Sequence, residues 1–142
     1  PDFVRLVCTA AGTAYTSFQM AVVLAGNERF SEFGTELTAD ANASLREAGA
    51  PVARWWMNGG NLAIAAATGS RQLARFVAKN AILAVNDEIV LAFGRQHSSD
   101  RVFTLPPAVL KPGSSLALHC WGPAMTAAPS FEVSLGWVER AG

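Results

Sequence analysis

Charged residues are scarce in this sequence, and neither sign predominates. Asp, Glu, Lys and Arg make up 15% of the 142 residues, whereas about 25% is ordinary for a soluble domain. Lys and Arg number 11, as do Asp and Glu, so the formal net charge is +0. The chain has no basic field that would attract nucleic acid or anionic lipid, and we expect neither as a partner. A surface short of charge indicates that another protein covers part of it.

Long hydrophobic runs and cysteines are also scarce. The longest apolar runs, such as LAIAAA and AILAV, fall far below the roughly 20 residues of a membrane span. No signal-peptide pattern opens the chain. Pro1 is what remains when an initiator Met is removed before a small residue, so we expect cytosolic synthesis. Without export, Cys8 and Cys120 are expected to be buried, reduced thiols. A disulfide between them is the alternative if the terminal strands are neighbours.

The sequence contains no metal-binding or catalytic pattern. It has two His and two Cys, without C-x-x-C or H-x-x-x-H spacing. His119 and Cys120 are adjacent on a predicted strand and therefore point to opposite faces, so they cannot share one metal. HSSD, residues 97–100, holds the residue types of a hydrolase triad, but four consecutive loop residues cannot form its relay, and the G-x-S-x-G elbow is missing. We predict a protein that is not an enzyme, with no catalytic residues, metal or cofactor.

Alternation of apolar and polar residues predicts β-strands at both ends of the chain. The side chains expected on one inner face of their strands are Val4, Leu6 and Cys8; Phe18, Met20, Val22 and Leu24; Leu116, Leu118 and Cys120; and Phe131, Val133, Leu135 and Trp137. The opposite face of residues 18–24 is also apolar, which predicts a strand buried on both sides. On the opposite face of residues 115–121, His119 is expected at the surface.

The middle of the chain is less clearly patterned. Helix formers between a cap at Thr38 or Asp40 and the stop signal at residues 49–51 predict one or two turns of helix. Residues 71–80 fit a helix or a strand. Two short apolar runs around Asn86-Asp87 predict a hairpin of Ile82–Val85 with Glu88–Phe93. In that hairpin, Ile89, Leu91 and Phe93 share one face.

Residues 101–121 predict a strand, a tight turn and a second strand. Pro106 and Pro107 lack backbone donors and therefore suit a sheet edge. Lys111-Pro112-Gly113 predicts the turn, because proline presets φ and glycine tolerates a positive φ. Short strands separated by Gly/Pro turns predict an all-β fold. We expect an antiparallel β-sandwich of jelly-roll type with one or two short helices, in a single domain over residues 1–142.

Tryptophans supply the candidate binding residues. Trp55 and Trp56 point opposite ways if they lie on a strand, so one enters the core while the other reaches the surface. An exposed tryptophan beside Arg54 is suited to stack on a sugar or to anchor an interface. Trp121 is the third such candidate. The alternative is that these rings pack inside the sandwich.

Two stretches resemble a known family. FTLPPAVLKPGSSLALHCWGPAMTAAPSFEVSLGWVER, residues 103–140, is similar to the closing strands of small jelly-roll virion proteins of tailed bacteriophages. These are head decoration (cement) proteins and the bases of head spikes and fibres. FVRLVCTAAGTAYTSFQMAVVLAGNERFS, residues 3–31, resembles the opening strands of phage cement proteins. Together they cover about half the chain, and residues 54–79 match no family.

The resemblance implies a non-enzymatic structural protein of the virion, assembled in the host cytoplasm. It would stabilise the head shell as a homo-oligomer, a dimer or a trimer, by binding the major capsid protein or other virion proteins. Two alternatives remain open. One is a receptor- or glycan-binding knob of a phage spike, fibre or tail. The other is a cellular carbohydrate-binding or tumour-necrosis-factor-like trimeric sandwich domain.

The predicted fold is tested by far-UV circular dichroism of the purified protein. We expect a spectrum dominated by β-structure, because alternation is the main pattern along the chain. A helix content above about a third, the average of globular proteins, would rule out the sandwich.

Overall fold

In the computed structural model, the described residues are 1–25, 35–36, 56–57, 70–94, 102–111 and 113–137. Within these ranges every regular element is a β-strand. The strands are β1 (Phe3–Ala10), β2 (Phe18–Ala25), β3 (Thr35–Glu36), β4 (Trp56–Met57), β5 (Ser70–Lys79), β6 (Glu88–Phe93), β7 (Val102–Leu105), β8 (Ser115–Trp121) and β9 (Ser130–Gly136). The described ranges contain no helix long and apolar enough to cross a membrane.

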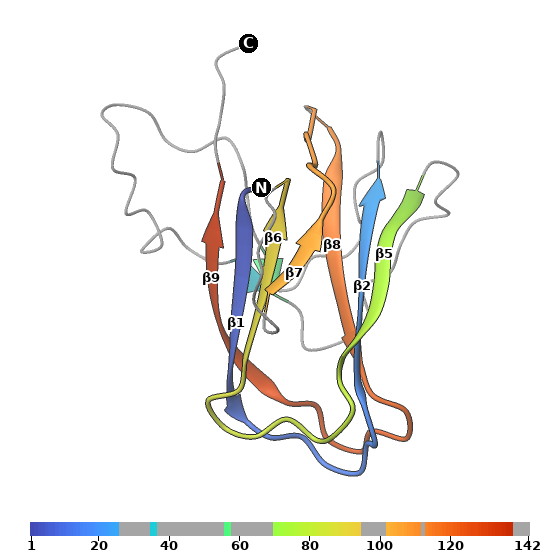
Figure 1. The fold of residues 1–142 in the computed structure, drawn as a ribbon, viewed down its shortest axis with the longest axis vertical. Coiled ribbons are helices and arrows are strands. Elements are labelled where there is room, and N and C mark those ends of the chain that lie inside the picture. The colour runs from blue at the N-terminus through green and yellow to red at the C-terminus, as the bar shows by residue number, and fades with distance from the viewer. Residues whose placement is uncertain (26–34, 37–55, 58–69, 95–101, 112, 138–142) are drawn as a thin grey trace.

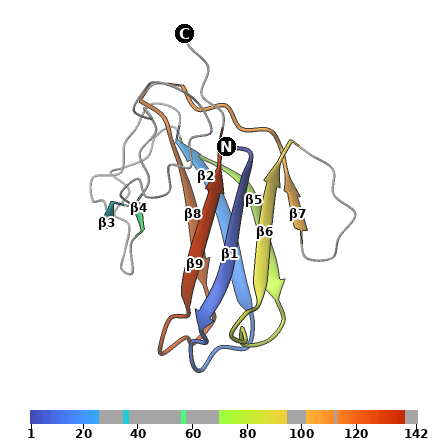
Figure 2. The ribbon, with the colours of Figure 1, turned by 90° about the vertical axis from the view of Figure 1, so that its left-hand side faces the viewer.

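Seven of these strands form two sheets that lie face to face (Figures 1 and 2). The four-stranded sheet has the order β7-β6-β1-β9, with β1 antiparallel to both β6 and β9 and with β7 parallel to β6. The three-stranded sheet has the order β5-β2-β8 and is antiparallel throughout. β3 and β4 form a separate antiparallel pair.

The core lies between the two sheets and draws on the inner face of each. On β1, the predicted inner residues Val4, Leu6 and Cys8 are all buried, as are Ile89, Leu91 and Phe93 on β6. Two aromatic contacts join the layers. The rings of Phe18 and Phe131 are 5.6 Å apart, and those of Phe76 and Phe103 stack at 4.4 Å. The predicted β-sandwich is therefore present.

β2 occupies the centre of its sheet, and the predicted burial of its two faces is more complete on one of them than on the other. Phe18, Met20 and Val22 point into the core and are at most 1% exposed. Ala21, on the opposite face, is also buried, at 6%. The strand has a neighbour on each side, and on its outer face Ala21 is buried while Gln19 and Val23 are half-buried.

The predicted hairpin of residues 82–85 with β6 is wrong. Residues 80–87 form no strand; they link β5 in one sheet to β6 in the other. Asn86 has a φ of 71°, and the Asp87 amide donates to the Ala84 carbonyl at 3.0 Å, which closes a turn inside the link. Stacked sheets lie about 10 Å apart, so a two-residue connection cannot pass between them. The preceding residues, which fitted a helix or a strand, are β5.

The strand-turn-strand prediction for residues 101–121 is confirmed locally. β7 is an edge strand, and Pro106 and Pro107 follow its last residue. In the turn, the Ser114 amide donates to the Lys111 carbonyl at 2.9 Å, and Gly113 has a φ of 84°. A side chain would be strained at this left-handed position, which is why glycine stands there. β7 and β8 nevertheless lie in different sheets, so the turn joins the layers.

Other predictions are only partly tested. A jelly roll has two four-stranded sheets, whereas the described strands form sheets of four and three, so jelly-roll topology stays a prediction, as does the single domain over residues 1–142. The helix expected after Thr38 lies outside the described residues. Phe131, Val133 and Leu135 pack against the core as expected. Trp137 is half-buried beyond the end of β9.

Candidate interaction surface

An apolar loop is exposed at one end of the sandwich. This loop, residues 81–85 with the sequence AILAV, lies in the link between β5 and β6, at the lower end of Figure 1. Only Leu83 enters the core, at 1% exposed. Ile82 and Val85 are 44% and 54% exposed, and the two alanines are exposed as well. Loops at protein surfaces are ordinarily polar, so four exposed apolar residues in one short loop indicate a contact surface.

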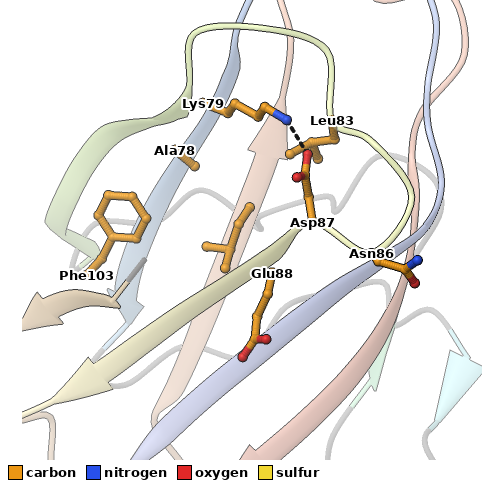
Figure 3. A pocket seen from close by; sticks show the side chains of 8 residues that line it. Ala78, Lys79, Leu83, Asn86, Asp87, Glu88 and Phe103 are labelled. Atoms are coloured by element: carbon orange, nitrogen blue, oxygen red, sulfur yellow. Dashed lines mark hydrogen bonds and ion pairs between the residues drawn. The ribbon is translucent and has the colours of Figure 1, made fainter. Parts of the chain in front are cut away.

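Hydrogen bonds hold the apolar loop in one conformation. The Leu83 amide donates to the buried Tyr15 hydroxyl oxygen at 2.9 Å. The Ala84 amide donates to a carboxylate oxygen of Asp87 at 2.6 Å. Lys79, the last residue of β5, forms an ion pair with the same oxygen (Figure 3). These bonds fix the loop before any partner arrives.

The backbone of the same link is also bonded to β1. The Asn86 amide donates to the Cys8 carbonyl at 2.8 Å, and the Cys8 amide donates to the Asp87 carbonyl at 2.8 Å. A loop already ordered in the free protein loses little conformational entropy on binding. The apolar loop is thus preorganised for contact.

Tyr15 connects the apolar loop to the rest of this end of the molecule. It is buried in the link between β1 and β2 and packs against Phe18, with ring centroids 6.3 Å apart. Gly122 lies against it: a Cβ at that position would be 2.7 Å from the Tyr15 Cβ. Any residue other than glycine at position 122 would force the backbone or the Tyr15 side chain to move. The place of Tyr15 therefore depends on the link between β8 and β9 as well.

A half-open pocket of about 230 Å³ adjoins the apolar loop. It is lined by Ala78, Lys79, Leu83, Asn86, Asp87, Glu88, Ile89 and Phe103 (Figure 3). Its charged side chains are paired, Lys79 with Asp87 and Glu88 with Arg5 at 2.7 Å. The hydrogen bond and charge of Glu88 raise the pKa of the Arg5 guanidinium. Because charges balance around the loop, its surroundings favour neither an anionic nor a cationic partner.

Only two of the predicted tryptophan candidates are among the described residues. Arg54 and Trp55 are outside the described residues, and Trp56 belongs to β4, where it pairs with Glu36. Trp121 is half-buried at the end of β8, with the Arg75 guanidinium 5.1 Å from its ring centroid. An interface role for these residues stays a prediction.

The two cysteines are free and differ in environment. Cys8 is buried as expected, and desolvation raises its pKa. The Cys120 residue as a whole is exposed on the edge strand β8, so the prediction of a buried residue is wrong there. Protein atoms nevertheless crowd the Cys120 thiol, and the lost hydration raises its pKa to about 12.

His119 also departs from expectation. The residue is half-buried, and its Nε2 is buried without a hydrogen-bond partner, whereas a surface histidine was predicted. Among the described residues, no group of three or more His, Cys, Asp or Glu side chains is placed to hold a metal ion.

Sequence reasoning missed the apolar loop and the tyrosine that positions it. The AILAV run is visible in the sequence, but its pattern predicts half of a hairpin. An apolar run beside turn residues fits a buried strand or an exposed loop equally well. The distinction requires knowing that only Leu83 points inward.

Comparison of the chain with protein-family models, with curated proteins and with solved structures found no match.

Replacing Tyr15 with phenylalanine tests the bond that anchors the apolar loop. Tyr15→Phe leaves the buried Leu83 amide without its acceptor, so we expect a loss of about 1–3 kcal/mol in the free energy of unfolding. Chemical denaturation measures this loss, and amide exchange at Leu83 should accelerate. The matched control is Thr13→Val, which removes an exposed hydroxyl that bonds Thr126. A loss no larger than that of the control would contradict the anchoring role.

The pH dependence of alkylation tests the Cys120 environment. Below a thiol's pKa the reactive thiolate increases about tenfold per pH unit. Because the pKa of Cys120 is raised to about 12, its reaction with iodoacetamide should still accelerate at this slope between pH 8 and 10. Mass spectrometry of the Cys120 peptide gives the rate. In urea, the same peptide should level off near the ordinary pKa, about 9. Levelling off by pH 9.5 in the folded protein would contradict the shift.

Proposed function

We propose that this protein is a non-enzymatic virion structural protein that decorates and stabilises the head shell of a tailed bacteriophage. The apolar loop forms its main contact with the shell. The observation that carries the proposal is this loop: Ala81, Ile82, Ala84 and Val85 are exposed on a backbone that is already hydrogen-bonded into place. An exposed apolar surface held in one conformation is suited to bind another protein.

The charge of the chain supports the same function. Copies of a decoration protein stand close together on a lattice, where a large net charge would make them repel one another. The formal net charge here is +0, and the ion pairs around the loop, Lys79–Asp87 and Arg5–Glu88, are internally balanced. Contact with the shell then depends on apolar burial.

The resemblance of residues 103–140 and 3–31 to small phage jelly-roll proteins supports the choice of partner. On that basis the partner is the major capsid protein or another virion protein, and the protein acts as a dimer or trimer of jelly-roll domains. Its mechanism is mass action. A protein that binds the assembled shell, and not its separate subunits, shifts the equilibrium toward the shell.

Particle composition tests the proposal directly. In virions of the phage that encodes the chain, quantitative mass spectrometry should find on the order of hundreds of copies, as a symmetric shell requires. A few copies per particle would instead fit a knob at a vertex or tail. A gene that lies among cellular genes, away from capsid genes, would contradict the proposal.

Substitutions in the apolar loop test the contact itself. Burying an Ile or Val side chain stabilises a complex by about 1.5–3 kcal/mol. The double change Ile82→Asp with Val85→Asp should therefore reduce the copies per virion at least about tenfold. Exposed positions tolerate substitution within about 0.5 kcal/mol, so the thermal melt should stay close to that of the wild type.

Val109→Asp is the matched control, because Val109 is 82% exposed and lies in the connection between β7 and β8. It should load onto particles as the wild type does. Normal loading of the double variant, or equal losses in both variants, would show that the loop is not the contact.

A further inference from the structure

The longest strand of the described sandwich has an open edge. β5 has ten residues and stands at the end of the order β5-β2-β8. No described strand pairs with its outer side. Arg71, Gln72, Arg75 and Val77 along it are exposed. The nearby edge strand β7 is shorter, with four residues, and prolines follow it. An open strand edge is a template for pairing with another chain.

The charges of β5 indicate which sign of charge the pairing chain should carry. Its sequence, SRQLARFVAK, has three cationic residues and no acidic one. Lys79 is paired with Asp87. Neither Arg71 nor Arg75 forms an ion pair with a described residue. Arg75 lies over the Trp121 ring and donates to Gln19 at 3.4 Å, contacts that leave its positive charge in place.

Arg71 and Arg75 lie on opposite faces of the sheet. Arg75 stands opposite Ala21 and Arg71 opposite Leu24, with a register shift between them. Residues directly opposite in a sheet share a face, whereas positions three apart on β2 lie on opposite faces. Arg75 extends across β2, where it bonds Gln19, toward Trp121 on β8, so its guanidinium points away from the open edge. An added strand would therefore meet Arg71 directly and Arg75 only through its longer-range positive charge.

The same charges disfavour pairing between two copies of β5. In the antiparallel register centred on Arg75, this residue would face Arg75 of the second copy, and Arg71 would face the second copy's Lys79. Like charges directly opposite one another destabilise a sheet. The edge is thus better matched to a segment of opposite charge than to itself.

We propose that the open edge of β5 binds an extended acidic segment of a partner protein, which adds a fourth strand to the three-stranded sheet. Backbone hydrogen bonds along β5 provide the affinity, and acidic side chains facing Arg71, with the positive charge of Arg75 nearby, provide the selectivity. This surface is separate from the apolar loop and does not depend on the head-shell function.

The test uses the purified full chain and two labelled ten-residue peptides. Both alternate Thr and Val; one carries Glu at three positions and the other carries Lys at the same positions. By fluorescence anisotropy, the Glu peptide should bind at least about tenfold more tightly than the Lys peptide, and its binding should weaken with salt. Amide exchange should slow along residues 71–79 when the Glu peptide is bound.

Charge-reversal variants localise the binding. Arg71→Glu should weaken binding of the Glu peptide about fivefold, the upper range of an exposed pair, and Arg71→Lys should bind as the wild type does. The matched control is Lys111→Glu, the same change of charge at another exposed position, which should have no effect.

Three results would overturn the proposal: no binding of the Glu peptide at 1 mM, equal binding of the two peptides, or slowed exchange on another strand. The variant with Asp at positions 82 and 85 should bind the Glu peptide normally. Failure at β5 and failure at the apolar loop are therefore distinguishable.

Discussion

Three connections cross between the sheets at one end of the sandwich, and the structure depends on how their backbone groups are satisfied. Residues 11–17 join β1 to β2, residues 80–87 join β5 to β6, and residues 122–129 join β8 to β9. Each crosses the thickness of the core, so it cannot use the tight turn of a hairpin. Backbone groups left unpaired there would cost stability. The three connections, which lie together at the lower end of Figure 1, satisfy some of these groups by hydrogen-bonding to one another.

The first connection, residues 11–17, is hydrogen-bonded to both of the other connections. The Thr13 amide donates to the Ala127 carbonyl at 3.0 Å, and the Thr126 amide donates to the Thr13 carbonyl at 3.1 Å. Tyr15, two residues on, accepts from Leu83. One short segment thus holds both other connections. The apolar loop is hydrogen-bonded into this end of the molecule, which is the physical basis for treating its exposed side chains as a contact surface.

The two proposed surfaces would bind their partners through different kinds of interaction. The apolar loop has no net charge around it and would bind through the removal of apolar area from water. The β5 edge would bind through backbone hydrogen bonds and charge, which salt weakens. A protein with both surfaces has one contact that is insensitive to ionic strength and one that responds to it.

Much of the strand pattern could be predicted from the sequence. Alternation placed Val4, Leu6 and Cys8 on the inner face of β1, because one face of a strand in a sandwich meets the core and the other does not. The buried inner face of β2, and the partial burial of its outer face, followed from apolar residues on both faces. The turn before Ser114 followed from Pro112-Gly113. These are local properties, set by side-chain period and by backbone preference.

The candidate surface could not be predicted in the same way. AILAV is apolar in either a hairpin strand or a loop, and only the assembled sandwich decides that Leu83 points inward while Ile82 and Val85 point out. The exposure of Cys120 likewise depends on which strand becomes the edge.

By itself, then, the sequence determined the all-β character, the inner faces and the low charge. The tertiary structure decided which strands share a sheet and which apolar residues stay outside, because both depend on contacts between segments far apart in the chain.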